Sequence, residues 1–412
     1  MATVVLLGTL DTKGEEYDFL RRKVREEGVD VLLVDTGILG VPLADPDISR
    51  QEVAEAAGAN AQELAESGDR GDAVEAMARG AGEIVKELHA QGRLDSVLAL
   101  GGSGGTAIAT QAMRELPVGV PKLMVSTMAS GDTRPYVGAV DVTLMYSVVD
   151  IAGLNPISER ILGNAAAAAA GMAKSQGPQA EAEKPLVGAT MFGVTTPSVT
   201  EARKRLEELG YEVLVFHATG TGGQSMEALM RSGFITASLD ITTTELADEL
   251  VGGVLSAGPE RLEAAGALGI PQVVSLGALD MVNFGPFETV PADFRDRLLY
   301  KHNPTVTLMR TMPEECAELG RVIAEKLNKA RGPLTIFVPL KGVSLIATEG
   351  QVFHDPAADE ALFGALREHL DPDVDLRELD LDINDPEFAQ AMADRLDALY
   401  RAWSSEHREV RA

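Results

Sequence analysis

The sequence contains a single cysteine, Cys316, among its 412 residues. A disulfide needs two cysteines and a structural zinc site usually needs several, so neither can be built from cysteines within this chain. No H-x-x-x-H pair is present, and Cys316 itself lies in a helical pattern. Zinc-peptidase and cysteine-nucleophile chemistry are therefore poor interpretations, and a cytoplasmic, reducing location suits the chain.

Basic side chains are scarce. The chain has 36 Lys and Arg against 63 Asp and Glu, which gives a formal net charge of -27. This charge repels phosphate backbones and anionic lipid at long range, so neither nucleic acid nor a membrane is an expected partner. An anionic ligand must instead be captured locally, by backbone amides and a few placed cations.

Long apolar runs are missing as well. The N-terminal stretch MATVVLLGTL is far shorter than the roughly 20 residues that span a bilayer. It lacks a basic leading segment and continues directly into an acidic helical pattern. We therefore interpret it as a buried strand and not as a signal peptide.

Short apolar runs alternate with longer amphipathic segments along the whole chain, which is typical of helices that cross over a parallel sheet. The predicted fold class is α/β, with two doubly wound, mostly parallel-sheet (Rossmann-like) domains. We expect an N-terminal domain over 1–175, a polar linker over 176–185 and a C-terminal α/β domain over 186–412. The second half opens with the same order of strand, turn, helix and strand as the first, so the two domains are expected to face a common cleft.

The pattern also predicts individual elements. The expected strands of the first half are 3–7, 31–34, 96–100, 122–126 and 140–145, and its main helices are 15–26, 49–65, 73–91, 106–115 and 156–172. Later strands are expected near 234–238, 272–275, 306–309, 335–338 and 374–376. The last helix, 386–403, either stays with the second domain or packs back on the first.

Ligands of open α/β sheets bind outside the carboxyl ends of the strands, so the segments after each strand carry the functional information. After the third strand, a glycine-rich run opens a helix: Gly101, Gly102, Ser103, Gly104, Gly105 and Thr106. Glycine lets the backbone approach a ligand closely, and the free amides of a helix N-terminus attract anions. We predict a phosphate site here; the alternative is a tight turn capped by Thr106.

The turn after the first strand has a different composition. It consists of Thr9, Leu10, Asp11, Thr12 and Lys13. It lacks the spacing of a dinucleotide loop and of a P-loop, yet a carboxylate, two hydroxyls and an ammonium suit a magnesium-bound polyphosphate, with Asp11 as the metal ligand. The alternative is a helix cap followed by a solvated lysine.

Two further turns complete the predicted nucleotide site. Asp35, followed by Thr36 and Gly37, ends the second strand, where an acidic residue can bind ribose hydroxyls or form an Asx-turn. The fourth strand leads into small polar residues: Ser126, Thr127, Ser130, Gly131 and Asp132. These residues either line the nucleotide or form an ordinary surface loop.

The second domain supplies the candidate catalytic residues His217, Asp240 and Lys341. His217 can shuttle a proton near neutral pH, Asp240 can orient that imidazole or help to hold magnesium, and Lys341 can neutralise an acidic substrate or a transferring phosphate. The alternative is that each side chain only braces a loop. The glycines after His217 suit a second anion site.

Other polar residues of the second half have less specific patterns. The pairs Thr242 with Glu245 and Ser198 with Glu201 have the spacing of helix capping boxes. Several loop residues suit the binding of a carboxylate or phosphate: Asp280, Asn283, His302, Asn303 and Arg310.

Several long strings carry a resemblance to a known family. GTLDTKG, VDTG, ALGGSGGT and STMASGDT in the first half, and FGVTTP, HATGTGG, DITTTEL, GALDMVNFGP, HNPTVTLMRT and PLKGVS in the second, resemble an uncharacterised bacterial family. That family is related to the N-terminal inhibitory domain of the tomato tobamovirus resistance protein. The resemblance implies ATP and magnesium in the N-terminal domain and a homodimer or higher homo-oligomer.

Three hypotheses of function follow. The first is an ATP-binding protein that uses the nucleotide in a reaction on a small acidic substrate. The second is a nucleotide-responsive regulatory module without turnover. The third is a nucleotide-independent lyase or hydrolase of a sugar phosphate. The expected partners are a nucleotide and a second copy of the chain.

Overall fold

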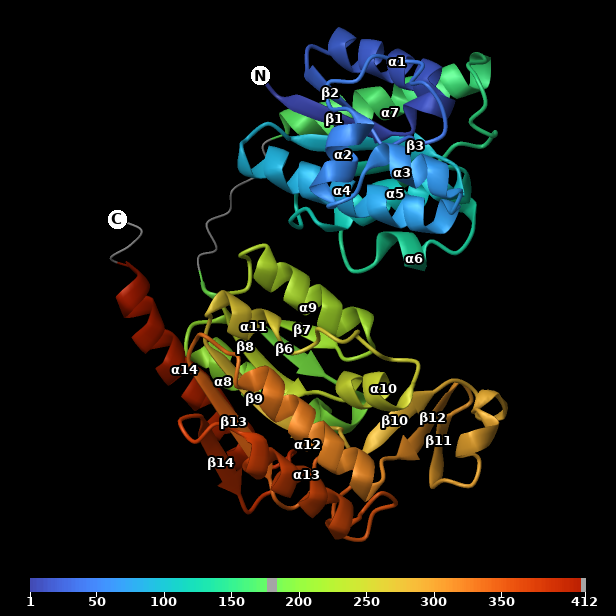
Figure 1. Ribbon diagram of the computed structural model, residues 1–412. Helices are drawn as coiled ribbons and strands as arrows, with labels where there is room; N and C mark the ends of the chain where they lie inside the picture. The colour runs from blue at the N-terminus through green and yellow to red at the C-terminus, as the bar shows by residue number, and fades with distance from the viewer. Residues whose placement is uncertain (176–183, 409–412) are drawn as a thin grey trace. The chain divides into compact units, whose positions relative to one another are not determined.

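The computed structural model describes residues 1–175 and 184–408 (Figure 1). The chain divides into two compact units, residues 1–179 and 180–412. The predicted linker 176–185 lies outside the described residues, apart from its last two positions. The predicted cleft between the domains stays a prediction.

The first unit is built on a five-stranded parallel sheet with the order β2-β1-β3-β4-β5. Its strands are β1 (Thr3–Gly8), β2 (Asp30–Asp35), β3 (Ser96–Gly101), β4 (Lys122–Ser126) and β5 (Val142–Tyr146). Every residue of β3 and β4 is buried, because helices cover both faces of the sheet. This strand order is one of the two common doubly wound arrangements.

Residues 1–175 contain seven α-helices. They are α1 (Leu10–Glu26), α2 (Arg50–Ala56), α3 (Ala61–Ser67), α4 (Arg70–Ala90), α5 (Ser103–Arg114), α6 (Arg134–Val137) and α7 (Pro156–Lys174). In Figure 1, α1 and α7 lie on one face of the sheet and α2, α4 and α5 on the other. The helix expected over 49–65 is divided into α2 and α3, because Gly58 adopts a left-handed φ of 69° and the Asn60 side chain caps α3.

The second unit contains a six-stranded parallel sheet with the order β14-β13-β9-β8-β6-β7. Its strands are β6 (Leu186–Met191), β7 (Glu212–His217), β8 (Ala237–Thr242), β9 (Gln272–Gly277), β13 (Leu334–Pro339) and β14 (Asp375–Leu379). Numbered within the unit, the order is 2-1-3-4-5-6. The second unit therefore repeats the strand order of the first and adds one strand.

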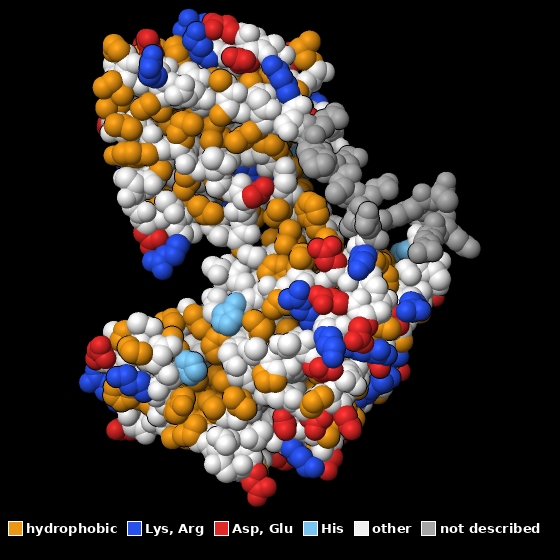
Figure 2. All heavy atoms as spheres, turned by 180° about the vertical axis from the view of Figure 1, so that it is seen from behind, with side chains coloured by type: hydrophobic (Ala, Val, Ile, Leu, Met, Phe, Trp, Pro, Cys, Tyr) orange, Lys and Arg blue, Asp and Glu red, His pale blue; other side chains and the backbone are white. Residues whose placement is uncertain are grey.

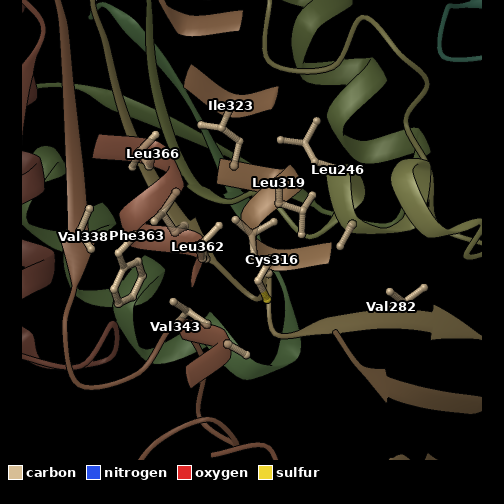
Figure 3. Close-up of a cluster of buried hydrophobic side chains, with 14 of the residues drawn as sticks. Leu246, Val282, Cys316, Leu319, Ile323, Val338, Val343, Leu362, Phe363 and Leu366 are labelled. Atoms are coloured by element: carbon tan, nitrogen blue, oxygen red, sulfur yellow. The ribbon is translucent and has the colours of Figure 1, made fainter. Parts of the chain in front are cut away.

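Helices again cover both faces. One face carries α8 (Thr196–Glu208) and α14 (Pro386–Arg408), and the other α9 (Thr221–Arg231), α10 (Glu245–Val251), α11 (Ala264–Leu268), α12 (Pro313–Leu327) and α13 (Pro356–His369). Figure 3 shows the apolar cluster in which Leu319 and Ile323 of α12 meet Leu362 and Leu366 of α13. The last helix, α14, packs on α8 and on the sheet of its own unit.

A small antiparallel sheet is inserted between β9 and β13. It has the order β10-β12-β11, from β10 (Met281–Phe284), β11 (Leu299–Asn303) and β12 (Val306–Arg310). The strand predicted over 306–309 is therefore present but antiparallel. It forms a hairpin with β11, and the Asn303 side chain accepts a hydrogen bond from the Thr305 amide (2.8 Å) in the turn.

Acidic and basic side chains are intermixed on the face of the second unit seen in Figure 2. The second unit contains surface ion pairs such as Arg203–Glu207 and Arg205–Asp394, both at 2.7 Å. Within 1–175 and 184–408, no helix is long and apolar enough to cross a membrane.

Candidate functional site

The first unit has a cavity of about 310 Å³ at the carboxyl ends of β1, β2 and β3. Its lining consists of Thr9, Asp11, Thr12, Lys13, Thr36, Gly37, Ile38, Leu39, Arg70, Ala73, Val74, Met77, Gly101, Gly102, Ser103, Gly104, Gly105, Ile108 and Asp150. In the order β2-β1-β3, the connections after β1 and β3 leave toward opposite sides, which opens a crevice between them. The cavity lies at this topological switch point.

The glycine-rich segment forms the first turn of α5. The helix begins at Ser103 and not at Thr106, and its N-cap Gly102 offers no side-chain cap. The first amides of a helix have no partner within the helix, so those of Ser103, Gly104 and Gly105 are free to bind an anion in the cavity. Thr106 lies behind this turn, where its hydroxyl donates to the Gly102 carbonyl (2.7 Å).

The fold does not require glycine at most of these positions. A Cβ at Gly104 would have Arg70 Nη2, 3.6 Å away, as its nearest atom, and a Cβ at Gly105 would lie 3.5 Å from the Leu100 carbonyl. Both are ordinary contacts, and neither residue has a positive φ. Since glycine within a helix costs up to about 1 kcal/mol relative to alanine, its use here indicates a role other than folding.

Arg70 is the cation closest to this turn. It is the first residue of α4, where a positive charge opposes the helix dipole. Its guanidinium lines the cavity and has no hydrogen-bond or ion-pair partner among the described residues. An exposed, unpaired guanidinium beside free helix amides suits a phosphate group.

Lys13 and Asp150 contribute charges of opposite sign. The Lys13 ammonium donates to the Ile151 carbonyl, and the Asp150 carboxylate accepts from the Ile151 amide (2.8 Å), which holds both side chains at the segment after β5. The hydroxyls of Thr9 and Thr12 lie 3.0 Å apart on the same wall. This wall can therefore bind a phosphate or a hydrated cation.

The opposite part of the lining is apolar. Ile38, Val74, Met77 and Ile108 come from the segment after β2 and from α4 and α5. Thr36 stands beside them, only 1% exposed, and its hydroxyl has no hydrogen-bond partner in the described structure. A buried polar group normally has a partner, so this hydroxyl points to a polar group on a ligand or to a water.

Two predicted ligand residues are committed to internal contacts. Asp35 accepts from the amides of Leu10 (3.1 Å) and Gly37 (2.9 Å) and from Arg50 Nε (2.8 Å). Asp35 is 1% exposed and does not line the cavity, so the predicted ribose contact is wrong and the alternative Asx-turn is present. Leu10 is buried beneath the cavity and is also not part of its wall.

Asp11 lines the cavity, but it also holds the loop after β2. One carboxylate oxygen accepts from the amides of Leu39 (2.7 Å) and Gly40 (3.3 Å) and lies 4.0 Å from Arg50. A Cβ at Gly37 would lie 2.5 Å from the other oxygen, which explains that glycine. Asp11 is therefore poorly suited to hold a metal ion.

The segment after β4 does not reach the cavity. Ser126 is fully buried and bonds the Thr106 hydroxyl (2.7 Å), and the exposed Asp132 forms a bidentate pair with Arg134 (2.7 and 2.9 Å) that lowers its pKa to about 2. None of the predicted residues of this segment lines the cavity: Ser126, Thr127, Ser130, Gly131 and Asp132. Their assignment as nucleotide contacts is not supported by the geometry.

Residues Gly101 to Gly105 also have the spacing of a G-x-S-x-G nucleophile elbow between a strand and a helix. Ser103, however, is the first residue of α5 and has no positive φ, unlike the strained serine of such elbows. The described lining contains no histidine that could serve as its base. Ser103 therefore does not have the backbone geometry of a nucleophile elbow.

In the second unit, Asp240 belongs to a buried ionic cluster. Its carboxylate forms two bonds with Arg261 (2.6 and 2.7 Å) and accepts from the Thr190 hydroxyl (2.7 Å). Arg261 also binds Glu245 (2.7 Å), and Glu227 lies 3.5 Å from it. Desolvation lowers the pKa of Arg261, but the surrounding carboxylates outweigh it and raise the pKa well above its ordinary value. Asp240 thus braces the core.

Glu245 fills the predicted second anion site. One of its oxygens accepts from the amides of Gly220 (2.7 Å) and Gly223 (3.0 Å) at the start of α9. Neither predicted capping box forms, because Glu245 points to α9 and the Ser198 hydroxyl has no partner in the described structure. The chain's own carboxylate occupies the place expected for a ligand.

The three candidate catalytic side chains do not converge. His217 is exposed at the end of the edge strand β7, with its ring 5.4 Å from that of Phe192. Lys341 follows β13, is 59% exposed and pairs with Asp380 (2.9 Å). Four strand steps separate β13 from β7, roughly 19 Å at the usual strand spacing. The predicted grouping with the buried Asp240 is wrong.

A second cavity, of about 620 Å³, lies beside Lys341. Its lining includes four carboxylates, of Glu349, Asp359, Glu360 and Asp382, but neither His217 nor Asp240. Asp359 is paired with Arg310 (2.8 Å), and Asp355 caps the neighbouring helix α13. This lining does not suit the acidic ligand predicted for Lys341.

Sequence reasoning missed Arg70 and Asp150. The predicted helix began at residue 73, which left Arg70 in a loop, whereas the Asp69 side chain caps α4 one residue before it. A basic residue directly after an N-cap aspartate was the available signal, because cations are unfavourable there. No comparable signal marks Asp150.

The fold and the cavity together define a class: a two-unit doubly wound α/β protein whose first unit has a cavity at its switch point, bordered by the start of α5. Residues 2–178 match the N-terminal domain, and residues 184–400 the C-terminal domain, of the uncharacterised protein family UPF0261. The chain belongs to this family.

Relatives extend over nearly the whole chain. It is 56% identical over 394 residues to a UPF0261 protein of Clostridium tetani, covering 95% of this chain and 98% of the relative. It is 42% identical over 413 residues to the ToMV resistance protein Tm-1(GCR237) of Solanum lycopersicum, covering 95% of this chain and 55% of that protein. The predicted relation to the tomato resistance protein is confirmed.

Solved structures are more distant. A UDP-N-acetylglucosamine 2-epimerase from Rickettsia bellii is 12% identical, with a TM-score of 0.22 over 66% of this chain and 78% of that one. The Streptomyces glycosyltransferase SsfS6, complexed with thymidine diphosphate, is 13% identical, with a TM-score of 0.21 over 97% and 96%. Scores this low carry no argument about the ligand.

Proposed function

We propose that the first unit binds ATP together with magnesium in the cavity at its switch point. The observation that supports this best is the start of α5, where free amides border the cavity at glycines that packing does not require. Arg70 and Lys13 add positive charge in a chain whose net charge is -27. The family resemblance implies the same ligand.

The proposed binding mode follows from the two walls. The phosphates accept hydrogen bonds from the α5 amides, and Arg70 and Lys13 offset their charge. The base lies against the apolar wall of Val74 and Met77, and the Thr36 hydroxyl bonds a polar group of the nucleoside. Asp35 takes no part, because its carboxylate is already satisfied.

For magnesium, Asp150 fits better than Asp11. The Asp150 side chain is exposed on the cavity wall and uses one oxygen for the Ile151 amide, whereas Asp11 holds the loop after β2. Magnesium commonly binds one or two carboxylates together with phosphate oxygens and water. Asp150 would hold the ion, which would offset phosphate charge.

Calorimetry with ATP and magnesium tests the proposal. The variant Gly104→Val introduces a side chain where phosphate oxygens would approach. Apart from its two chain neighbours and the backbone of its own helix, the only atom of the described residues within 4 Å of the added Cβ is Arg70 Nη2, at 3.6 Å, so the change should not disturb the fold. We expect binding to the wild type and loss of binding in Gly104→Val. The matched control is Gly163→Val, the same change in the α7 helix of the same unit, where nothing lies within 4 Å of the added Cβ.

Two further measurements separate the other hypotheses. If the protein binds ribose 5-phosphate but not ATP, a sugar-phosphate enzyme is favoured. Phosphate release from bound ATP distinguishes turnover from a regulatory role. Equal ATP affinity in Gly104→Val and Gly163→Val would contradict the proposed site.

A further inference from the structure

The cavity opens where β1 and β3 stop pairing. The two strands are in register from Val4 and Ser96 to Leu7 and Ala99. In a parallel ladder, the pairing of Leu7 with Ala99 is closed by a hydrogen bond from the Leu100 amide to the Leu7 carbonyl, which is the last bond of this register. The ligand-binding segments begin directly afterwards, at Thr9 and at Gly101.

The Tyr17 hydroxyl of α1 is inserted at this point. It accepts a hydrogen bond from the Leu100 amide (2.9 Å), and its one proton has two acceptors in reach, the Leu7 carbonyl (2.6 Å) and the Leu100 carbonyl (3.0 Å). The Leu100 amide and the Leu7 carbonyl are the donor and the acceptor of that last ladder bond. The phenol is fully buried, and burial strongly raises its pKa, so the hydroxyl keeps the proton that it donates.

The sequence is adapted to this insertion. A Cβ at Gly8 would lie 2.0 Å from ring atoms of Tyr17, so the ring can cross β1 only where the strand has no side chain. Gly8 therefore serves Tyr17 and not a ligand. Neither Gly8 nor Tyr17 lines the cavity, but they lie next to the points where the Thr9–Lys13 wall and the start of α5 begin.

We propose that Tyr17 is a positioning residue that holds β1 and β3 apart and thereby sets the width of the nucleotide cavity. This inference rests on the proposed function. Without the hydroxyl, the Leu100 amide and the Leu7 carbonyl pair directly, because both are buried and an unpaired buried group is costly. The Thr9–Lys13 wall then moves toward the start of α5, and the phosphates no longer fit.

The test is Tyr17→Phe in the full chain, with ATP and magnesium as the probe. We expect the affinity to fall about tenfold or more while the protein remains folded. Tyr211→Phe removes a buried hydroxyl from the second unit, where it bonds Asp397 (2.8 Å), and should leave the affinity unchanged. Val24→Ala destabilises the same helix, α1, far from the strand junction, and should also bind ATP normally.

A crystal structure of ligand-free Tyr17→Phe separates the two proposals. We expect a direct hydrogen bond between Leu100 and Leu7. If the strands stay apart, or if the variant binds ATP as tightly as the wild type, the positioning role is overturned. If the wild type does not bind ATP, the proposed function fails, and the strand geometry of the variant still decides whether Tyr17 acts as a spacer.

Discussion

Arg50 and Arg70 differ in their neighbours, and this decides what each can do. Arg50 binds Asp35 and the Gly40 carbonyl, so its charge is used within the fold. Arg70 lines the cavity of the first unit, which Arg50 does not, and has no partner among the described residues. Of the two arginines, Arg70 is therefore the one placed to contact a ligand in the cavity.

Arg70→Ala should therefore weaken ATP binding without loss of stability. A hydrogen bond to a charged group is worth about 1.5–3 kcal/mol, which corresponds to roughly a 10- to 150-fold loss of affinity. Arg79→Ala is the matched control, because Arg79 is exposed on the same helix and pairs with Glu75 (2.8 Å). Similar affinities in both variants, measured by calorimetry, would remove Arg70 from the site.

Asp248 of α10 is a buried carboxylate with three donors. It accepts from the Leu255 and Asn283 amides (both 3.1 Å) and from Asn283 Nδ2 (2.6 Å). Burial raises its pKa to about 7. The unfolded chain has the ordinary value near 4, so the folded state holds an extra proton between about pH 4 and pH 7.

The contribution of Asp248 to stability should therefore decrease as the pH rises. This contribution is fully present below about pH 4. It decreases as the pH rises from about 4 to about 7, by at most about 1.4 kcal/mol per pH unit. Asp248→Asn does not titrate, so the wild type should lose stability relative to this variant between pH 5 and pH 7.5 in urea unfolding. Asp380→Asn, at an exposed position, should show no such trend. If the difference in free energy of unfolding between the wild type and Asp248→Asn does not change with pH, the raised pKa of Asp248 is refuted.

At the scale of elements, the sequence predicted the parallel strands because their apolar runs are continuous. It placed the start of α5 three residues late, since glycines normally indicate a turn, and Gly104 and Gly105 are helical here. The ion pairs of Asp35 and Asp240 could not be predicted, because their partners Arg50 and Arg261 lie 15 and 21 residues away in the chain. An acidic residue at a strand end has the same local pattern whether it binds a ligand or an arginine.

Glu245 links α10 to the start of α9, so its removal should affect an entire helix end. Glu245→Ala frees the Gly220 and Gly223 amides and removes one partner of the buried Arg261. We expect a loss of about 3–5 kcal/mol in the free energy of unfolding of the second unit, measured in urea. Glu249→Ala, at an exposed position of the same helix, should cost about 0.5 kcal/mol or less. Acetate, which carries the missing carboxylate, should stabilise Glu245→Ala more than the wild type; a loss equal to that of Glu249→Ala would contradict this role.

The whole molecule consists of two units with the same strand order and separate cores. The apolar clusters of the first unit contain only residues before 175, and its sheet has no strand from the second. The cavity is lined entirely by the first unit. This organisation predicts that the first unit is sufficient for folding and for binding.

A fragment of residues 1–175 should therefore unfold cooperatively in urea and bind ATP with the affinity of the full chain. Its two core clusters and complete sheet provide the stability, and every lining residue is retained. Calorimetry and circular dichroism on the fragment check both points. A folded fragment that has lost ATP affinity would show that the second unit or another copy of the chain contributes to the site.

Glu245 also gives the two units different responses to their surroundings. A carboxylate attached to the same chain has a fixed and high effective concentration, so the start of α9 keeps its anion whatever the solution contains. Among the described residues the start of α5 has no side-chain cap, so under the proposed function its occupancy would rise and fall with the concentration of free nucleotide. If the proposed site binds nucleotide, the first unit would respond to a changing supply, whereas the start of α9 would not.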